Sequence, residues 1–189
     1  VGGRTSFQQN LGVVESYGLE LRTLLEGPSL AAPLPTLDVS YTYLQSAVVQ
    51  GIVTSAVDGA PEDISGNELP AAPTHTATVG LSKTFSDIGL TLSTDLSYTG
   101  RFYTDLENLE QTNNRGERGP VPSRTVLDAG ATYEHSDALS VQLTAKNVTD
   151  NVYIGSRLHS NPRQPSANLS TGIIPGARRQ VNLSIRYSF

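Results

Sequence analysis

The sequence contains no cysteine, no methionine and no tryptophan, and charged residues make up only 16% of its 189 positions. The absence of cysteine fits a protein that crosses an oxidising periplasm, and it fits a thiol-free soluble domain equally well. Lysine and arginine form no cluster or stripe, and the net charge of -5 is mild, so the composition argues against nucleic-acid binding. Serine, threonine, asparagine, glutamine and 17 glycines fill the chain instead, as is typical of strands with one polar face.

Long hydrophobic runs are absent as well. No stretch approaches eighteen consecutive apolar residues, which excludes a transmembrane helix. It does not exclude a membrane-spanning barrel, because barrel strands carry a much weaker signal per segment. No signal peptide begins at Val1. We therefore expect the chain to be a mature product or a fragment of a longer protein.

The clearest pattern lies at the end of the chain. From Val181 to Phe189 every second residue is apolar or aromatic, and the residues between them are polar. This alternation predicts a strand with one dry face and one wet face. The strand finishes on an aromatic pair, Tyr187 and Phe189, and aromatic residues at the rim of lipid-facing strands form the girdle of an outer-membrane barrel.

The same alternation recurs in earlier segments, so we predict about seven strands of about ten residues, a length that suits a tilted membrane crossing. We place them roughly at residues 16–26, 37–50, 76–85, 90–103, 124–134, 139–146 and 181–189.

The connections between these strands alternate between short and long. The long ones are predicted at about 51–73, 106–122 and 153–177. Transmembrane barrels have short periplasmic turns and long extracellular loops, whereas a soluble sandwich gives no reason for strict alternation. The predicted fold class is therefore all-β, an antiparallel transmembrane β-barrel segment. Seven strands in an open sheet would leave two unpaired edges in lipid, so we expect this to be part of a larger barrel.

Four short motifs resemble the TonB-dependent outer-membrane receptors. They are the GxE-type strand at Tyr17-Gly18-Leu19-Glu20-Leu21, the LPxxPxH-type segment from Leu69 to His75, the xNLFDxxY-type segment from Lys146 to Tyr153, and the PGxPR-type segment from Ile174 to Arg179. They occur in the family's order and cover nearly the whole chain. The region from Tyr98 to Pro122 is most similar to the ferric-siderophore and ferric-dicitrate branch.

The resemblance implies that residues 1–189 are the C-terminal portion of a 22-stranded type of barrel, without the plug domain and TonB box of the whole receptor. It implies import of ferric siderophores across the bacterial outer membrane, with the TonB complex acting through the missing plug region. The implied partners are the ferric ligand, outer-membrane lipid and the barrel-assembly machinery, which reads a C-terminal signature that Phe189 resembles. No cofactor and no nucleic acid are expected.

Candidate ligand contacts follow from charge. Ferric siderophore complexes are often anionic, so basic residues in the predicted extracellular loops are candidates for substrate binding. These candidates are Arg115, Arg118, Arg157, His159 and Arg163. Each of them can equally be an ordinary solvated loop charge. No catalytic residue and no metal site is expected, because the three histidines lie far apart and no nucleophile elbow surrounds any serine.

Three other functions remain open at this point. A passive porin-like channel would share the strand pattern but would have no upstream plug. A soluble all-β binding module would need no detergent. An outer-membrane barrel enzyme should show a serine and histidine pair on one rim, which the pattern does not offer.

Overall fold

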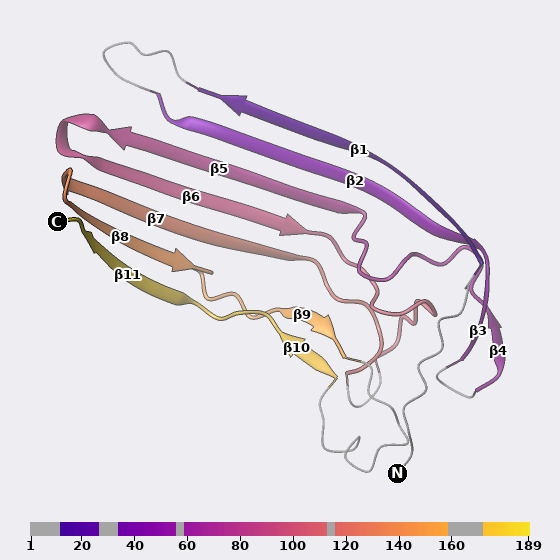
Figure 1. The fold of residues 1–189 in the computed structure, drawn as a ribbon. Helices are drawn as coiled ribbons and strands as arrows, with labels where there is room; N and C mark the ends of the chain where they lie inside the picture. Colours follow the sequence, from indigo (N-terminus) through magenta and orange to yellow (C-terminus); the bar gives the residue numbers. More distant parts are fainter. Residues whose placement is uncertain (1–11, 27–33, 56–58, 113–115, 159–171) are drawn as a thin grey trace.

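A computed structural model describes residues 12–26, 34–55, 59–112, 116–158 and 172–189. Its main feature is one seven-stranded antiparallel sheet in which neighbours in sequence are neighbours in space (Figure 1). The strands are β1 (Val13–Leu25), β2 (Thr36–Gln50), β5 (His75–Phe85), β6 (Leu90–Thr99), β7 (Arg124–Ser136), β8 (Leu139–Lys146) and β11 (Gln180–Tyr187). The predicted all-β class and the predicted number of sheet strands are confirmed.

Two small hairpins lie outside the sheet, in segments that the sequence predicted as loops. Strand β3 (Ile52–Thr54) pairs with β4 (Pro61–Asp63), and β9 (Ile154–Arg157) pairs with β10 (Ile173–Pro175). The sequence analysis missed both because three or four residues are too few to show an alternation. One turn of 3₁₀-helix, η1 (Ser86–Ile88), joins β5 to β6. In the described ranges, no helix has the length and hydropathy that a membrane crossing requires.

The register places the alternating apolar residues of all strands on one face of the sheet. Val39 of β2 pairs with Val79 of β5, and Val79 pairs with Leu96 of β6. On the same face, toward the β11 edge of the sheet, Leu143 of β8 lies between Ala131 of β7 and Leu183 of β11. An exposed apolar face of this extent marks a surface that contacts lipid or another protein.

The opposite face of the sheet is polar and carries ion pairs between neighbouring strands. Arg22 Nη2 lies 2.7 Å from Asp38 Oδ2, and Lys146 Nζ lies 2.8 Å from Asp128 Oδ2. The register places Lys146 of β8 directly beside Asp128 of β7, which accounts for the second of these pairs.

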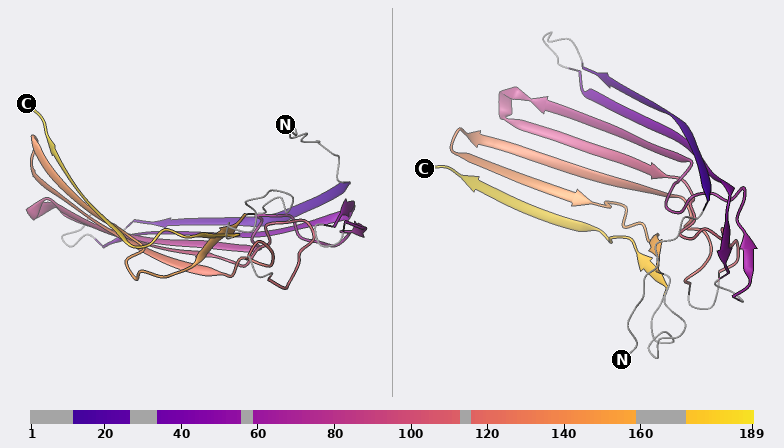
Figure 2. Two further views of the ribbon diagram at one scale, coloured as in Figure 1. Left: turned by 90° about the horizontal axis from the view of Figure 1, so that it is seen from below. Right: turned by 45° about the vertical axis from the view of Figure 1, so that its right-hand side comes forward.

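The two ends of the sheet differ. At the turn end, η1 and the tight turn near Asp137 connect the strands; at the loop end, residues 51–74, 100–123 and 147–179 do so. Figure 2 shows that the sheet is curved rather than flat, as twisted antiparallel sheets are. Aromatic residues lie on the apolar face near both ends. His75 contacts Tyr41 and Tyr43 at the loop end, and Tyr187 contacts Phe189 at the turn end.

Candidate functional site

The predicted ligand-binding residues belong to the loop end, and this end contains the molecule's buried core. In the described part of the chain, the buried apolar side chains all lie here: Val48, Ile64, Phe102, Tyr103 and Val121. Phe102 and Val121 also exchange two backbone hydrogen bonds, of 3.2 and 2.7 Å. We call the described residues of 46–74, 100–123 and 147–179 the loop unit. It is a folded structure with its own apolar interior.

Asn108 joins the first long connection to the second. Its backbone has a left-handed conformation with φ of 51°, which asparagine tolerates better than most residues. Its side-chain oxygen accepts a 2.6 Å bond from the Glu68 amide, and its side-chain nitrogen donates to the Glu68 carbonyl at 3.0 Å. The Ala71 amide donates to the Tyr103 carbonyl at 2.8 Å. These bonds fix two segments that lie about forty residues apart in the sequence.

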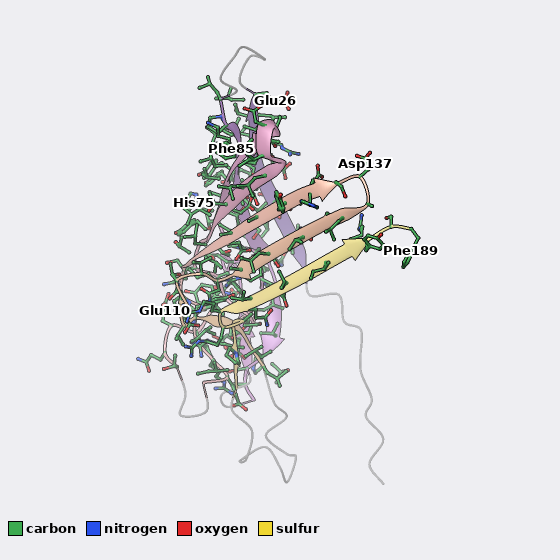
Figure 3. All side chains as sticks on the ribbon, turned by 90° about the vertical axis from the view of Figure 1, so that its left-hand side faces the viewer. Glu26, His75, Phe85, Glu110, Asp137 and Phe189 are labelled. Carbon is green, nitrogen blue, oxygen red and sulfur yellow. The ribbon has the colours of Figure 1, made fainter. Side chains whose placement is uncertain are left out.

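Arg101, Tyr103 and Glu110 form a compact polar cluster in the same unit. The guanidinium of Arg101 lies 2.6 Å from a Glu110 carboxylate oxygen, and the Tyr103 hydroxyl also donates to that oxygen. Burial, followed by the hydrogen bond to Glu110, raises the pKa of Tyr103 to about 12. The bonds from Tyr103 and Arg101 lower the pKa of Glu110. The cluster is therefore internally paired, with the tyrosine neutral and the carboxylate charged near neutral pH. Figure 3 labels Glu110 at this end of the molecule.

Arg157 joins the second long connection to the third. Its buried guanidinium donates to the Gly116 carbonyl at 2.6 Å and to the Pro120 carbonyl at 2.9 and 3.2 Å. Burial lowers its pKa. Gly116 lies directly beneath Ile173, because a Cβ at that glycine would come within 2.6 Å of Ile173 Cγ1. The hairpin β9–β10 is thus docked on the turn at residues 116–120 through this arginine.

The side chains of Asn147 and Asp150 join the two ends of the third connection. Asn147, fully buried with a φ of 49°, donates to the carbonyls of Asn151 and Ala177 at 2.9 Å each and accepts from the Asn151 amide at 2.9 Å. Asp150 receives a forked bond from Arg178, at 2.9 and 2.5 Å. The bond from Arg178, followed by the one from the Arg179 amide, lowers the pKa of Asp150. The NLFDxxY-like and PGxPR-like segments therefore meet in space.

The structure places two of the five predicted ligand contacts. Arg118 is half-buried beside a hollow that Val53, Thr54 and Leu106 also line. Arg157 is the buried residue described above. Arg115, His159 and Arg163 lie outside the described residues, and their ligand contacts stay a prediction. Sequence reasoning missed Arg124 as a site residue, since a single arginine at a strand start carries no distinguishing pattern. Its guanidinium carbon lies over the rings of Phe102 and Tyr153.

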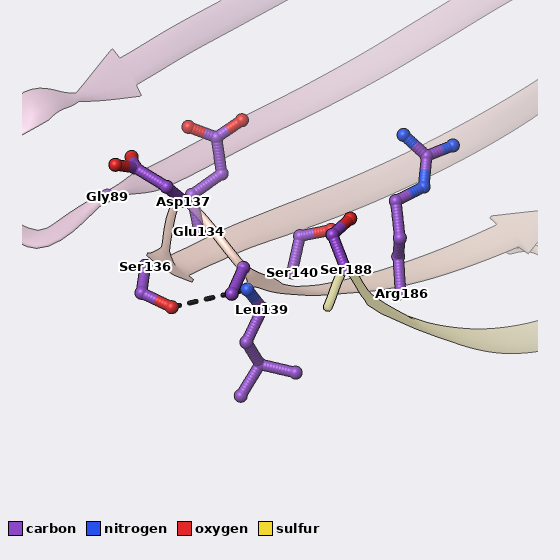
Figure 4. Close-up of a pocket in the computed structure, with 9 residues that line it drawn as sticks. Gly89, Glu134, Ser136, Asp137, Leu139, Ser140, Arg186 and Ser188 are labelled. Carbon is purple, nitrogen blue, oxygen red and sulfur yellow. Dashed lines mark hydrogen bonds between the residues drawn. The ribbon is translucent and has the colours of Figure 1, made fainter.

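A larger hollow lies at the opposite end of the sheet (Figure 4). It has a volume of 510 Å³ and is bordered by the strand ends of β7, β8 and β11, with Glu134, Asp137 and Arg186 among its lining residues. The Ser136 hydroxyl accepts a bond from the Leu139 amide at 3.2 Å and so shapes the turn beside it. None of the predicted ligand contacts that the structure describes lies here. The described residues contain no group of three or more acidic or histidine side chains that is able to hold a metal ion.

The comparisons with known proteins agree with this architecture. The model of the family described as "TonB dependent receptor-like, beta-barrel" matches residues 1–148. No curated protein matches the sequence.

Three solved structures with the same fold illustrate the similarity. The siderophore receptor PiuA from Acinetobacter baumannii superposes with a TM-score of 0.66 at 22% identity, over 92% of this chain and 22% of that one. The ferric citrate transporter FecA in its unliganded form gives 0.64 at 20% identity, over 82% and 21%. The ferric yersiniabactin uptake receptor FyuA from Yersinia pestis gives 0.69 at 16% identity, over 95% and 24%. The chain thus spans less than a quarter of each of these structures.

Proposed function

Because this chain belongs to the TonB dependent receptor-like β-barrel family, we propose that it forms the C-terminal part of the barrel wall of an outer-membrane transporter that binds and imports ferric siderophore complexes. The observation that supports this most strongly is the continuous apolar face of the sheet. It runs over all seven strands, and its large side chains are exposed, from Leu19 of β1 to Ile185 of β11. In water this face would be unfavourable, whereas in a bilayer each side chain is in contact with lipid tails.

The two ends of the sheet suggest how the chain is oriented. Outer-membrane barrels have short turns on the periplasmic side and long loops outside. We therefore assign the turn end to the periplasm and the loop unit to the cell exterior. In this orientation Val181, Leu183 and Ile185 face lipid, while Asn182, Ser184 and Arg186 face the lumen.

The mechanism that we propose is binding and passage without bond chemistry. The ferric complex binds at the outer mouth, with Arg115, Arg118, His159 and Arg163 as the candidate contacts. Arg157 supports this surface from beneath, through its bonds to the Gly116 and Pro120 carbonyls. Passage then requires rearrangement of a plug and energy from the TonB complex, through parts of the receptor outside these residues. Of the solved structures named above, FecA is described as a ferric citrate transporter, FyuA as a ferric yersiniabactin uptake receptor and PiuA as a siderophore receptor, which supports iron as the cargo.

The test uses the full-length receptor in a bacterial strain that lacks its own ferric-chelate receptors. Cells are given radioactive iron complexed to a panel of siderophores and citrate, with and without a functional TonB protein. We expect uptake of one chelate that disappears in the absence of TonB. TonB-independent uptake, together with ion currents through the purified protein in planar bilayers, would indicate a porin-like channel instead. A protein that stays monomeric in solution without detergent would exclude the barrel proposal.

A further inference from the structure

Arg124 is the first residue of β7 and lies on the polar face of the sheet, at its loop end. It pairs with Thr99 of β6 in the register. Side chains along a strand alternate between faces, so Arg124 shares a face with Asp128, which binds Lys146 there. In the orientation proposed above, this position is the lumen wall at the outer mouth. A ligand that enters the barrel passes this wall.

The connections that follow the two strands beside β7 each place an aromatic ring against Arg124. Phe102 follows β6, and its ring centroid lies 5.7 Å from the guanidinium carbon. Tyr153 follows β8, and its ring centroid lies 5.4 Å from the same atom. Aromatic faces attract a guanidinium and hold its orientation, but they do not neutralise its charge. The arginine is therefore held in place by residues that come from both sides of its strand.

No carboxylate reaches this guanidinium within the described residues. The Nη1 nitrogen of Arg124 is buried and has no hydrogen-bond partner among the residues that the structure describes. The carboxylate nearest along its own strand, Asp128, lies about 13 Å away by the strand rise and is already bonded to Lys146 and to the Asn147 amide. A buried donor without an acceptor is unfavourable, and more so when it is charged.

Three arginines of the neighbouring loop unit are paired with acceptors. Arg101 binds Glu110, Arg178 binds Asp150, and Arg157 binds two carbonyls. Arg124 thus differs from its neighbours in being oriented by rings but lacking an acceptor. An oxyanion is the group that completes such a site, because the planar guanidinium matches a carboxylate with two parallel hydrogen bonds.

We propose that Arg124 binds an oxyanion of the ferric complex, so that the cargo of this receptor is an anionic chelate. This inference rests on the function proposed above and narrows its substrate class. The rings of Phe102 and Tyr153 exclude water around the guanidinium, which strengthens a charge-assisted bond to a carboxylate or catecholate oxygen. A neutral ferric hydroxamate offers no such partner.

The experiment measures equilibrium binding of radioactive ferric chelates to the purified full-length receptor in detergent. Ferric dicitrate and ferric enterobactin serve as anionic probes, and ferrichrome serves as the neutral probe. The variants are R124Q, R124K and the matched control R186Q. Arg186 lies on the same polar face, at the turn end, and has no carboxylate partner in the described part of the chain.

We expect the wild-type receptor to bind an anionic probe. R124Q should bind that probe about 10- to 100-fold more weakly, because it loses a charged hydrogen bond. R124K should lose less affinity, because it keeps the charge and loses only the planar geometry of the guanidinium. R186Q should bind like wild type. Tyr153→Leu should weaken binding less than R124Q, since the charge of Arg124 remains.

Several outcomes would overturn the inference. Binding of ferrichrome but of neither anionic probe would refute it and leave the proposed transport function standing. Equal binding by R124Q and wild type would place the missing acceptor in another part of the polypeptide. A loss of heat resistance in R124Q, without a change in affinity of the folded fraction, would show a structural role. Failure of wild type to bind any ferric chelate would refute the proposed function itself.

Discussion

The sheet and the loop unit differ in where their apolar side chains go. In the sheet, Leu183 and Leu19 keep 66% and 53% of their surface exposed, although both lie in regular strands. In the loop unit, Ile64 and Val121 are completely buried, although both lie in or beside connections. This is the reverse of a soluble protein, in which strands hold the core and loops cover it.

The difference indicates which part of the chain needs an external apolar phase. The loop unit contains its own core and its own network of buried hydrogen bonds, so its structure depends on packing within the protein. Within the described ranges, no apolar layer packs on either face of the sheet, so its stability depends on backbone pairing and on lipid contact. Shortening an apolar side chain should therefore destabilise the loop unit, whereas introducing a charge on the apolar face should destabilise the sheet. Both expectations can be tested in the full-length receptor.

The largest effect is expected from shortening a side chain in the loop-unit core. Ile64→Ala should lower the local opening free energy of the loop unit by about 2–5 kcal/mol, since it leaves a cavity that the surrounding residues fill only in part. Hydrogen exchange measured by mass spectrometry would report this as faster exchange in residues 46–74. The matched control is Ile52→Ala, which removes the same atoms from a residue that is 64% exposed in the same connection. Equal effects of the two variants would mean that the loop unit has no core of its own.

A charge on the apolar face of the sheet should be nearly as unfavourable. Leu143→Arg places a guanidinium among Ala131 and Leu183, and it should cost about 2–4 kcal/mol near the middle of a bilayer. Its neighbour Gln142 points to the opposite face, so Gln142→Arg should be close to neutral. Reversible unfolding in lipid vesicles, followed by the loss of heat-modifiable migration on gels, measures both. If Gln142→Arg destabilised the barrel more than Leu143→Arg, the assignment of the apolar face to lipid would be wrong.

A smaller effect is expected where the two regions join. Asn147→Ala removes three hydrogen bonds at the base of the third connection and places alanine at a positive φ, with an expected loss of about 1–3 kcal/mol in local stability. Limited proteolysis of the connection after β8 gives the readout. Asn147→Gly separates the two causes, because glycine tolerates this backbone conformation but makes none of the bonds. If the glycine variant were as resistant as wild type, the bonds would not hold the connection.

The smallest effect is expected from acidification of the Asp150–Arg178 pair. The pKa of Asp150 is lowered in the folded state, so its carboxylate contributes stability above the unfolded pKa of 3.8. That contribution is lost only as the pH falls through the lower pKa of the folded state. The proteolysis rate of the third connection should therefore change little between pH 7 and about pH 4 on account of this pair. Asp150→Asn should raise the rate at neutral pH and remove the acid dependence below pH 4. Asp137→Asn, in the turn at the other end, controls for the loss of a charge alone.

Much of the sheet was predictable because its signal is local. Alternation between apolar and polar residues assigns each strand residue to a face without any knowledge of its neighbours, as in Val181 to Tyr187. The lengths of the connections then separated the turn end from the loop end. Four short motifs indicated the family. The match over residues 1–148, which includes the motifs from Tyr17 to Leu21 and from Leu69 to His75, confirms it.

The partners of the charged side chains depended on tertiary structure. Lys146 reaches Asp128 only because β7 and β8 pair in one particular register, and register is a property of two strands rather than of one. Arg157 was predicted as a loop charge available to ligand, and the fold places it beneath the turn at 116–120. The sequence by itself therefore determined which face of each strand is apolar, since that follows from a period of two. Only the packing of the connections decided which cations in the described ranges are paired, and that Arg124 lies over two rings with its Nη1 unbonded there.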